Sequence, residues 1–403
     1  MSGGEGSNRK LWDKGYKISS LVEKFTVGND YLVDMVLVKY DCLATIAHAR
    51  MLHKVGIYSE DELSRITDEL NNIIKLSESG KFEITPEQED CHTAIENYLV
   101  AKVGEAGKKI HMYRSRNDQV LTALRLYYKD KLKEIVKQIE NFQMVLKDFR
   151  KKFGRIRIPG YTHTRKAMPT TVGMWAECWI DSMKDNKRRL LSTLDLIDQS
   201  PLGAGAGYGL PAKIDRGFTA RLLNFKRIQK NPIYCMNSRG KFEADIIHTL
   251  SLISFDLNKL ATDIIFYSMP EIGVFILEKS ICTGSSIMPH KTNPDVFEIT
   301  RANHHVINSL EQQVKNISSN LISGYHRDFQ LQKEAIIKSF HIVLTSLEVA
   351  THVFQFVKVD RKRAKKLLTD ELFSVEEAYK LSMEKGIPFR EAYSIITKKY
   401  CCK

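Results

Sequence analysis

The sequence predicts an all-α protein built around a long bundle of helices, and three observations support this. Glycine and proline are scarce, with 22 and 10 among 403 residues. Apolar residues recur every three or four positions over long stretches, whereas the strict alternation of a half-buried strand is nearly absent. A hydrophobic fraction of 43% and a charged fraction of 27% fit a globular chain that can bury a sizeable core.

Six long helices account for most of the chain. The first spans about residues 31–54 and is apolar on almost every side. The other five span about residues 118–153, 170–198, 240–267, 294–319 and 330–356. Pro169 marks the beginning of the second of these five. Helices of roughly 25 to 35 residues are far longer than average, so we expect a bundle large enough to bury them, including by association of subunits.

Three helical domains are expected: an N-terminal domain of residues 1–110, a central bundle domain of residues 111–360, and a short C-terminal domain of residues 361–403. The composition turns strongly basic at the second boundary. Within the central domain, residues 203–209 read Gly-Ala-Gly-Ala-Gly-Tyr-Gly, which lets backbones approach closely. A nucleotide-binding loop is disfavoured there, because no strand precedes the glycines.

The net charge is +13, from 61 lysines and arginines against 48 aspartates and glutamates. A basic balance fits either nucleic acid or a small anionic substrate. The denser basic parts, residues 184–189 and 361–366, contain no interleaved aromatic residues. We therefore expect a small-molecule substrate and no nucleic-acid partner.

Cysteine use and hydropathy indicate the compartment. The seven cysteines lack metal-site spacing, and only Cys401 and Cys402 are adjacent, which indicates a reducing compartment and no zinc site. No apolar run reaches the roughly 18 residues of a membrane span, and the first seven residues are polar and unlike a signal peptide. These features predict a cytoplasmic protein that does not enter a membrane.

Residues 284–295 carry the strongest functional signal. They read Gly-Ser-Ser-Ile-Met-Pro-His-Lys-Thr-Asn-Pro-Asp, so a flexible start is followed by two hydroxyls, a cation and an amide. Lys291 and Asn293 can hold a carboxylate, and a serine stands where a proton could move. The structural alternative is a capped turn, in which Asn293 caps the next helix and Pro294 takes its first position. Both interpretations can hold together.

Two further segments have functional and structural interpretations. His92 and Thr93 follow an acidic run at a helix start, where His92 is either functional or paired with Glu96 on the helix surface. Residues 114–119 read Arg-Ser-Arg-Asn-Asp-Gln and pack two guanidiniums, a hydroxyl and two amides into six positions. That is more donor capacity than a capped turn needs, and arginine binds carboxylates through two parallel hydrogen bonds.

A histidine on a turn and a polar stripe on the first helix complete the candidates. His163, after a Pro-Gly turn, is either a proton-transfer group or a structural histidine. Asp34, Asp41 and His48 are spaced by seven and share one face of an otherwise apolar helix. They form either a buried polar network or the outer shell of a site.

These four segments, His92-Thr93, residues 114–119, Tyr161-Thr162-His163 and residues 284–295, resemble the fumarase/aspartase superfamily of lyases in their order. Its members eliminate across a C–N or C–O bond and release fumarate. Within it, the argininosuccinate lyase family is the most similar, through residues 115–119, 291–295 and 388–392. The resemblance covers essentially the whole chain.

The resemblance implies the last step of arginine biosynthesis, the reversible elimination of argininosuccinate to arginine and fumarate through an aci-carboxylate carbanion. Ser285 would be the base and His163 the acid, with His163 oriented by Glu298. The reverse assignment of base and acid is equally compatible with the sequence. Lys291 would bind the carboxylate that becomes negative. No metal ion or organic cofactor is implied.

Substrate binding would fall to a second group of residues. The succinyl end would be held by Arg116, Asn117 and Thr162, and the arginine end by Tyr325, Gln330 and Lys333. The full implied set is His92, Thr93, Ser115, Arg116, Asn117, Thr162, Ser286, Met288, Asn293, Tyr325, Gln330 and Lys333. The family picture also implies a long central bundle of five helices in each subunit. It implies a homotetramer with a core of twenty helices, in which each active site draws on three subunits.

Several positions depart from the family pattern. Tyr113 replaces a small glycine, Arg165 adds a cation after His163, and His290 replaces a common glutamine. Residues 27–30 offer no counterpart to a serine contact of the family, and the C-terminal domain is short by several tens of residues.

Three other functions are weighed against this one. Adenylosuccinate lyase is supported by His290 but opposed by residues 116–119 and 388–392. A structural protein recruited from the same fold, as in lens crystallins, is opposed by the intact Ser285, His163 and Lys291. A basic nucleic-acid-binding protein would show steeply salt-dependent binding.

Overall fold

The structure, a computed structural model, describes residues 18–401, with side chains through residue 400. The first seven residues, Cys402 and the side chain of Cys401, all discussed above, lie outside this description. The chain forms two compact units. Unit 1 comprises Met1–Glu134, Leu190–His248 and Ser309–Phe340, and unit 2 comprises Ile135–Arg189, Thr249–Asn308 and His341–Lys403.

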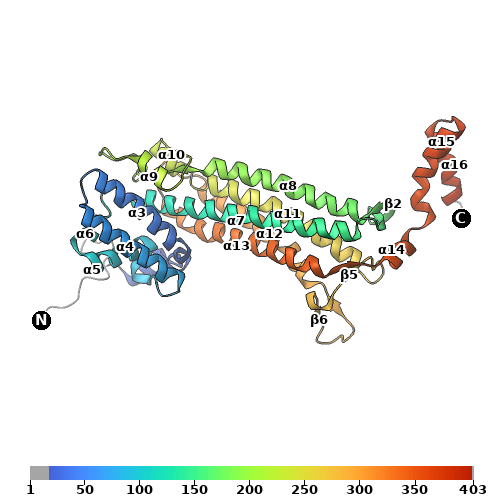
Figure 1. Ribbon diagram of the computed structural model, residues 1–403, viewed down its shortest axis with the longest axis horizontal. Coiled ribbons are helices and arrows are strands. Elements are labelled where there is room, and N and C mark those ends of the chain that lie inside the picture. Colours follow the sequence, from blue (N-terminus) through green and yellow to red (C-terminus); the bar gives the residue numbers. More distant parts are fainter. Residues whose placement is uncertain (1–17, 402–403) are drawn as a thin grey trace. The chain divides into compact units, whose positions relative to one another are not determined.

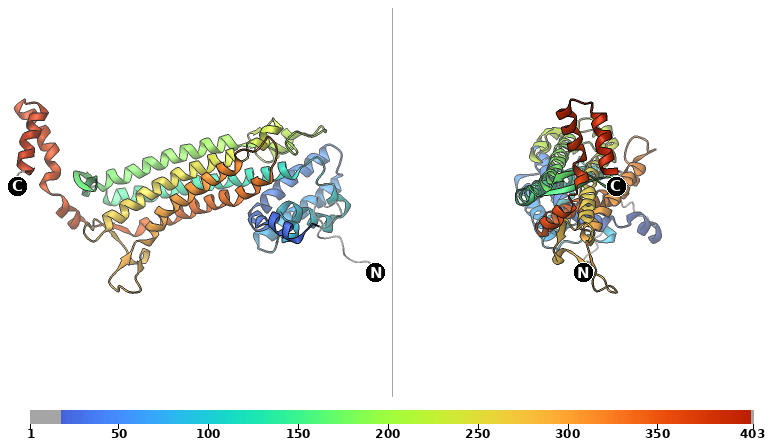
Figure 2. Two further views of the ribbon diagram at one scale, coloured as in Figure 1. Left: turned by 180° about the vertical axis from the view of Figure 1, so that it is seen from behind. Right: turned by 90° about the vertical axis from the view of Figure 1, so that its right-hand side faces the viewer.

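Five long helices contribute to both units and lie side by side in each of them (Figures 1 and 2). They are α7 (Arg116–Phe153), α8 (Val172–Ile197), α11 (Lys241–Ser268), α12 (Asp295–Ser318) and α13 (Gln332–Val353). The predicted all-α fold with a long five-helix bundle is confirmed, and each helix begins and ends within three residues of its expected limits.

Buried aromatic rings pack these helices within each unit. In unit 1, the rings of Tyr128 and Phe340 stack with centroids 6.0 Å apart, and both side chains are fully buried. In unit 2, Phe149 meets Phe354 edge to face at 5.5 Å. Such pairs stabilise a core beyond the burial of their apolar area, by about 0.5–1.5 kcal/mol each.

The remaining elements of unit 1 are further helices and one pair of two-residue strands. The helices are α1 (Ser20–Val27), α2 (Asp30–Val33), η1 (Asp34–Leu37), α3 (Val38–Lys54), α4 (Glu60–Glu78), η2 (Pro86–Gln88), α5 (Cys91–Val103), α6 (Glu105–Lys108), α9 (Arg216–Leu222), α10 (Pro232–Asn237) and η4 (Arg327–Leu331). Strands β3 (Gln199–Ser200) and β4 (Arg227–Ile228) pair in parallel.

The helix expected over residues 31–54 is broken, because a 3-10 turn at Asp34–Leu37 separates α2 from α3. The Asp34 carboxylate at this turn accepts hydrogen bonds from Lys333 and from the backbone N–H of Cys91. Both partners are distant in sequence, so the contacts that accompany the break could not be read from local pattern.

Unit 2 adds three antiparallel strand pairs and a small helical C-terminal part. The pairs are β1 (Arg157–Thr162) with β2 (Arg165–Thr171), β5 (Phe275–Leu277) with β8 (Val357–Val359), and β6 (Thr283–Gly284) with β7 (Thr292–Asn293). The helices are η3 (Lys279–Ile281), η5 (Phe354–Phe356), α14 (Arg361–Leu367), η6 (Asp370–Phe373), α15 (Ser374–Lys385) and α16 (Phe389–Cys401).

The β1–β2 hairpin is the main element that the sequence did not indicate. Thr162 pairs with Arg165, so His163 and Thr164 form a two-residue turn. Their φ angles are 52° and 58°, as a type I′ turn requires. Such turns favour Asn-Gly, and a β-branched Thr164 at positive φ is rare, so the turn carried no recognisable signal.

Among residues 18–401, no helix is both long and apolar enough to cross a membrane.

Candidate active site

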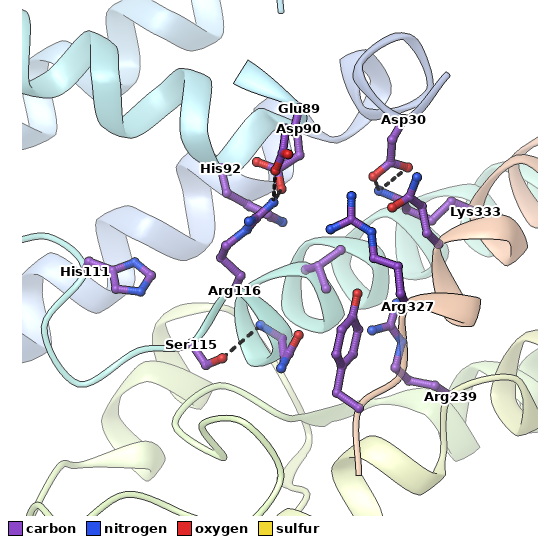
Figure 3. Close-up of a pocket in the computed structure, with 14 residues that line it drawn as sticks. Asp30, Glu89, Asp90, His92, His111, Ser115, Arg116, Arg239, Arg327 and Lys333 are labelled. Carbon is purple, nitrogen blue, oxygen red and sulfur yellow. Dashed lines mark hydrogen bonds and ion pairs between the residues drawn. The ribbon is translucent and has the colours of Figure 1, made fainter. Parts of the chain in front are cut away.

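A polar pocket in unit 1 gathers most of the predicted substrate-binding residues (Figure 3). The cavity has a volume of about 340 Å³, at the small end of the range for small-molecule sites. It is lined by Asp30, Glu89, Asp90, His92, His111, Ser115, Arg116, Asn117, Val120, Arg239, Tyr325, Arg327, Gln330 and Lys333.

The beginning of α7 places Ser115, Arg116 and Asn117 at this pocket. The Ser115 hydroxyl accepts the N–H of Asn117 at 3.2 Å, and the Asp118 carboxylate accepts the N–H of Ser115 at 2.9 Å. These reciprocal bonds satisfy N–H groups that a helix start leaves free. The motif therefore combines residues that face the cavity with residues that hold the helix end.

Asp118 also fixes the glycine-rich segment of residues 203–209. Its second carboxylate oxygen accepts the N–H groups of Gly203 and Gly205, both at 2.9 Å. Both glycines have positive φ, at 85° and 66°, so the tight approach of this backbone depends on them. Burial raises the pKa of Asp118 to about 6, against the lowering effect of the three N–H donors.

His92 is buried at the first turn of α5, beside the carboxylate of Asp41. Its Nδ1 lies 3.0 Å from Asp41, and Asp41 also accepts Gln119 Nε2 at 3.0 Å. Burial alone would lower the pKa of His92, but Asp41, with help from Asp90, raises it above 6.5. The His92 Nε2 atom is buried and has no hydrogen-bond partner among the described residues.

Arg116 is oriented by two carboxylates from the chain before α5. It contacts Asp90 and lies 3.4 Å from Glu89. Asp90 is also the N-cap of α5 and accepts the N–H of the buried Thr93 at 2.9 Å. Burial would raise the pKa of Asp90, but His92 and Arg116 hold it well below its usual range.

Lys333, on α13, forms a buried ion-pair triad with Asp30 and Asp34. Its ammonium lies 2.6 Å from both Asp30 and Asp34, and its side chain is 5% exposed. Burial opposes the charge of Lys333, but the two carboxylates raise its pKa above the usual range. Burial raises the pKa of Asp30 to about 6.

The polar stripe Asp34, Asp41 and His48 is thus a buried network in which two members contact pocket residues. His48 donates Nε2 to the carbonyl of Met112 at 2.9 Å and does not line the pocket. The buried polar network is confirmed, and the role of the stripe as the outer shell of a site stays a prediction.

Pocket residues that the sequence analysis missed include Asp30, Arg239 and Arg327. Asp30 lies in the segment for which no family counterpart was found. Arg327 and Gln330 donate to the carbonyl of Thr26, at 2.9 and 3.1 Å. An arginine directly before a glycine at the start of a long helix was the available signal for Arg239.

The loop of residues 285–291, between β6 and β7, stands away from the helices of unit 2 (Figure 1). The Ser285 hydroxyl accepts the N–H groups of Ile287 at 3.4 Å and Met288 at 3.1 Å. Donors on this oxygen would stabilise a negative charge there. Ser286, Met288 and Lys291 are exposed, and Ile287 at the loop tip is 83% exposed.

Lys291, Asn293 and Glu298 line a second cavity, of about 470 Å³, within unit 2. Asn293 is a strand residue rather than a helix cap, and its amide lies 3.4 Å from the carbonyl of Gly284. Glu298 lies on the first turns of α12.

Thr162 and His163 are exposed at the hairpin turn of unit 2. Within residues 18–400, neither His163 nor Glu298 has an ion-pair partner, so the structure does not bring this expected pair together.

One buried group has the donor types of a metal site. Ligand atoms of Asp34, Cys91 and His92 lie within 4.8 Å of one another. Lys333 already neutralises Asp34, and burial raises the pKa of the Cys91 thiol well above its usual value. A protonated thiol is a poor ligand, so these residues fit a protein network better than a metal ion.

Two solved structures have a similar fold. An EDDS lyase variant with bound fumarate matches with a TM-score of 0.80 and 21% identity, over 95% of this chain and 76% of that one. A class II fumarase from Schistosoma mansoni matches with a TM-score of 0.76 and 15% identity, over 93% of this chain and 91% of that one. At such identities the likeness establishes the helical fold alone.

Sequence comparison gives the family. A profile described as lyase matches residues 15–307. The argininosuccinate lyase of Thermotoga neapolitana is 52% identical over 98% of both chains, and that of Phocaeicola vulgatus is 38% identical over 96% of this chain and 86% of the relative. The chain therefore belongs to the argininosuccinate lyase family of the fumarase/aspartase superfamily.

Proposed function

We propose that this chain is an argininosuccinate lyase, which splits argininosuccinate reversibly into arginine and fumarate. One observation carries the proposal beyond family membership. The resemblance assigned Arg116 and Asn117 to the succinyl end of the substrate and Tyr325, Gln330 and Lys333 to the arginine end. These residues come from segments about 200 positions apart, and they line one cavity in unit 1.

The charges of the pocket suit the charges of this substrate. Argininosuccinate carries three carboxylates and a guanidinium group. Arg116, Arg239 and Arg327 offer planar donors that match carboxylates. Asp30 and Glu89 line the same cavity and offer anions for the guanidinium.

The reaction breaks a C–H bond beside a carboxylate and then the C–N bond. The base takes the proton from the succinyl carbon, and the electron pair spreads into the neighbouring carboxylate as an aci-carboxylate. The pair then forms the C=C bond of fumarate as the guanidino nitrogen leaves and takes a proton from the acid. The chemistry therefore needs one base, one acid and cations at the carboxylate.

We assign these roles to residues of unit 2. Ser285 is the base, supported by the two N–H donors on its hydroxyl. His163 is the acid, with Glu298 as its orienting partner in the assembled site. Lys291 and Asn293 stabilise the carboxylate that gains charge. Thr162, Ser286 and Met288 contact the substrate beside them.

The site is proposed to form only in a homotetramer. A serine hydroxyl is a poor base in water and needs a site that excludes it. Ser286, Lys291 and His163 are exposed, so another subunit must cover them. Apolar side chains in unit 2 such as Met174, Phe255 and Ile299, which are 72%, 44% and 64% exposed, offer surface for such association. We propose that three subunits contribute to each site, within a core of twenty helices.

The biological setting and domain division follow as proposals. The reaction is the last step of arginine biosynthesis, and the reducing environment indicated by the cysteines supports a cytoplasmic location. Residues 1–110, 111–360 and 361–403 would be the three domains.

Mixing the purified chain with argininosuccinate and following fumarate by its absorbance tests the proposal. We expect fumarate and an equal amount of arginine, and no fumarate from adenylosuccinate in a parallel sample. Fumarate from adenylosuccinate alone would overturn the assignment and give His290 the leading role. No product from either substrate, in a sample that sizing shows to be tetrameric, would favour a recruited structural protein.

A further inference from the structure

The side chain of Arg239 enters the pocket from the turn between α10 and α11 (Figure 3). The turn is tightly constrained. Gly240 has φ of 77°, and a Cβ atom at this position would lie 1.7 Å from Ser318 Oγ. The Gly240 N–H donates to Glu243 at 2.7 Å, and the Arg239 N–H donates to Met236 O at 3.0 Å. The backbone that presents Arg239 is therefore fixed before any ligand binds.

Two aromatic rings hold the guanidinium in place. Its central carbon lies 5.2 Å from the ring centre of Tyr325 and 4.9 Å from that of Phe329. A cation over aromatic faces is attracted to them, and a planar guanidinium stacks well there. The rings fix the side chain without using its N–H groups, which stay available for hydrogen bonds.

Among residues 18–400, Arg239 has no carboxylate partner, unlike two other cations of the pocket. Arg116 is bound to Glu89 and Asp90, and Lys333 to Asp30 and Asp34. Arg239 is 5% exposed, and its Nη1 is buried without a hydrogen-bond partner among residues 18–400. A buried charged donor left unpaired is unfavourable, so a bound anion at this point would complete the site.

We infer that Arg239 binds the α-carboxylate of the arginine part of the substrate. The inference rests on the proposed function, which supplies a ligand with a carboxylate at each end. Tyr325, which packs on Arg239, belongs to the set assigned to the arginine end. The α-carboxylate lies far from the bond that breaks, so Arg239 contributes to recognition of the amino acid rather than to the elimination.

The inference separates the two products of the reaction. Arginine carries the α-carboxylate, agmatine is arginine without it, and fumarate comes from the other end of the substrate. In the reverse direction, Arg239→Gln should raise the KM for arginine by roughly 10- to 100-fold and leave the KM for fumarate within about twofold. Arg239→Lys keeps the charge but loses the planar fork, so it should restore only part of the affinity.

Calorimetric binding of arginine and agmatine tests the same point without turnover. The unaltered chain should bind arginine more tightly than agmatine, and Arg239→Gln should remove that preference by weakening arginine alone. Lys241→Gln removes an exposed cation from the same turn and should leave both affinities unchanged. Tm should be unchanged or raised in Arg239→Gln, because an unpaired buried charge is lost.

The kinetic and binding results distinguish failure of the inference from failure of the proposed function. A higher KM for fumarate with unchanged arginine binding would place Arg239 at the succinyl end and overturn the inference. Equal loss for arginine and agmatine, with a lower Tm, would make Arg239 a structural residue and also overturn it. Absence of turnover with an arginine preference that depends on Arg239 would overturn the proposed function and support the inference.

Discussion

The pocket of unit 1 and the loop and turn of unit 2 carry residues of one proposed reaction in opposite physical states. In the pocket, Arg116 and Lys333 are each held by two carboxylates, and Lys333 is 5% exposed. In unit 2, Lys291 and His163 are exposed and have no ion-pair partner within residues 18–400. The pocket of unit 1 is held in place by contacts within the chain. The loop and turn of unit 2 leave most of their polar groups exposed.

The difference indicates a division of labour. Ion pairs with buried partners keep their geometry, because separating the two groups would leave a buried charge with neither water nor a counter-ion around it. Exposed groups on a loop and a two-residue turn can move and can be completed by another surface. We therefore expect recognition to be built within each chain and proton transfer to depend on assembly.

The largest effect is expected for Ser285→Ala. Loss of the proposed base should lower kcat by about 10²- to 10⁴-fold. Because the side chain lies on an exposed loop, the free energy of unfolding should change by less than about 0.5 kcal/mol. Steady-state kinetics and urea unfolding measure both. Ser286→Ala is the matched control and should lose less activity, whereas near-normal turnover of Ser285→Ala would remove this residue from the mechanism.

Mixing two inactive variants tests whether the two regions come from different subunits. Ser285→Ala and Arg116→Gln should each be inactive alone, because each removes one part of the site. In randomly reassembled tetramers, about one site in four would combine intact parts from two different chains, and activity should recover to that extent. No recovery, in tetramers shown by mass spectrometry to be mixed, would place both residues in the same chain at each site.

Lys333→Met tests the organised pocket. The change leaves Asp30 and Asp34 buried without a cation and should lower the free energy of unfolding by about 3–5 kcal/mol. Lys39→Met, which removes the half-exposed partner of Glu78, should lower it by less than about 1 kcal/mol. Urea unfolding of both variants gives the comparison, and equal effects would contradict it.

Asp41→Asn should change how stability depends on pH. The raised pKa of His92 contributes stability that is fully present below pH 6.5 and is lost as pH rises through the raised value. Without the Asp41 carboxylate this contribution shrinks, so the variant should be less stable by about 1–3 kcal/mol below pH 6.5 and by less at higher pH. Unfolding curves between about pH 5 and 9 measure the difference.

An exposed pair of a histidine and a glutamate provides the control for that experiment. His53 lies 3.1 Å from Glu60, which is 86% exposed, so Glu60→Gln should change stability by less than about 0.5 kcal/mol at any pH. If Asp41→Asn lowers the free energy of unfolding by the same amount across the pH range, Asp41 does not raise the pKa of His92.

The five bundle helices were predictable because their pattern is local. A 3.6-residue apolar period without interruption by glycine or proline specifies a helix wherever it occurs. The β1–β2 hairpin was missed because His163 and Thr164 carry no hairpin-turn signal, and the break at Asp34 because its partner Lys333 lies 299 positions away. Local pattern cannot report contacts that only tertiary packing creates.

The residues of the candidate site were likewise predictable only where the signal was local in sequence. Residues 114–119 and 284–295 were found because several polar groups stand close together in sequence. Asp30 and Arg239 were not found, because each is a single charged residue whose role depends on distant neighbours. The roles of all site residues and the three domain boundaries stay predictions.

The start of α7 bears on efforts to alter substrate preference. Arg116 and Asn117 face the cavity, whereas Asp118 anchors the glycine segment and Gln119 reaches Asp41 beneath His92. A combinatorial library that randomises the whole motif would mix recognition positions with scaffold positions, and most of its members would lose the frame that makes a new specificity readable. Keeping Asp118 and Gln119 fixed would confine the search to positions where variation can change the ligand.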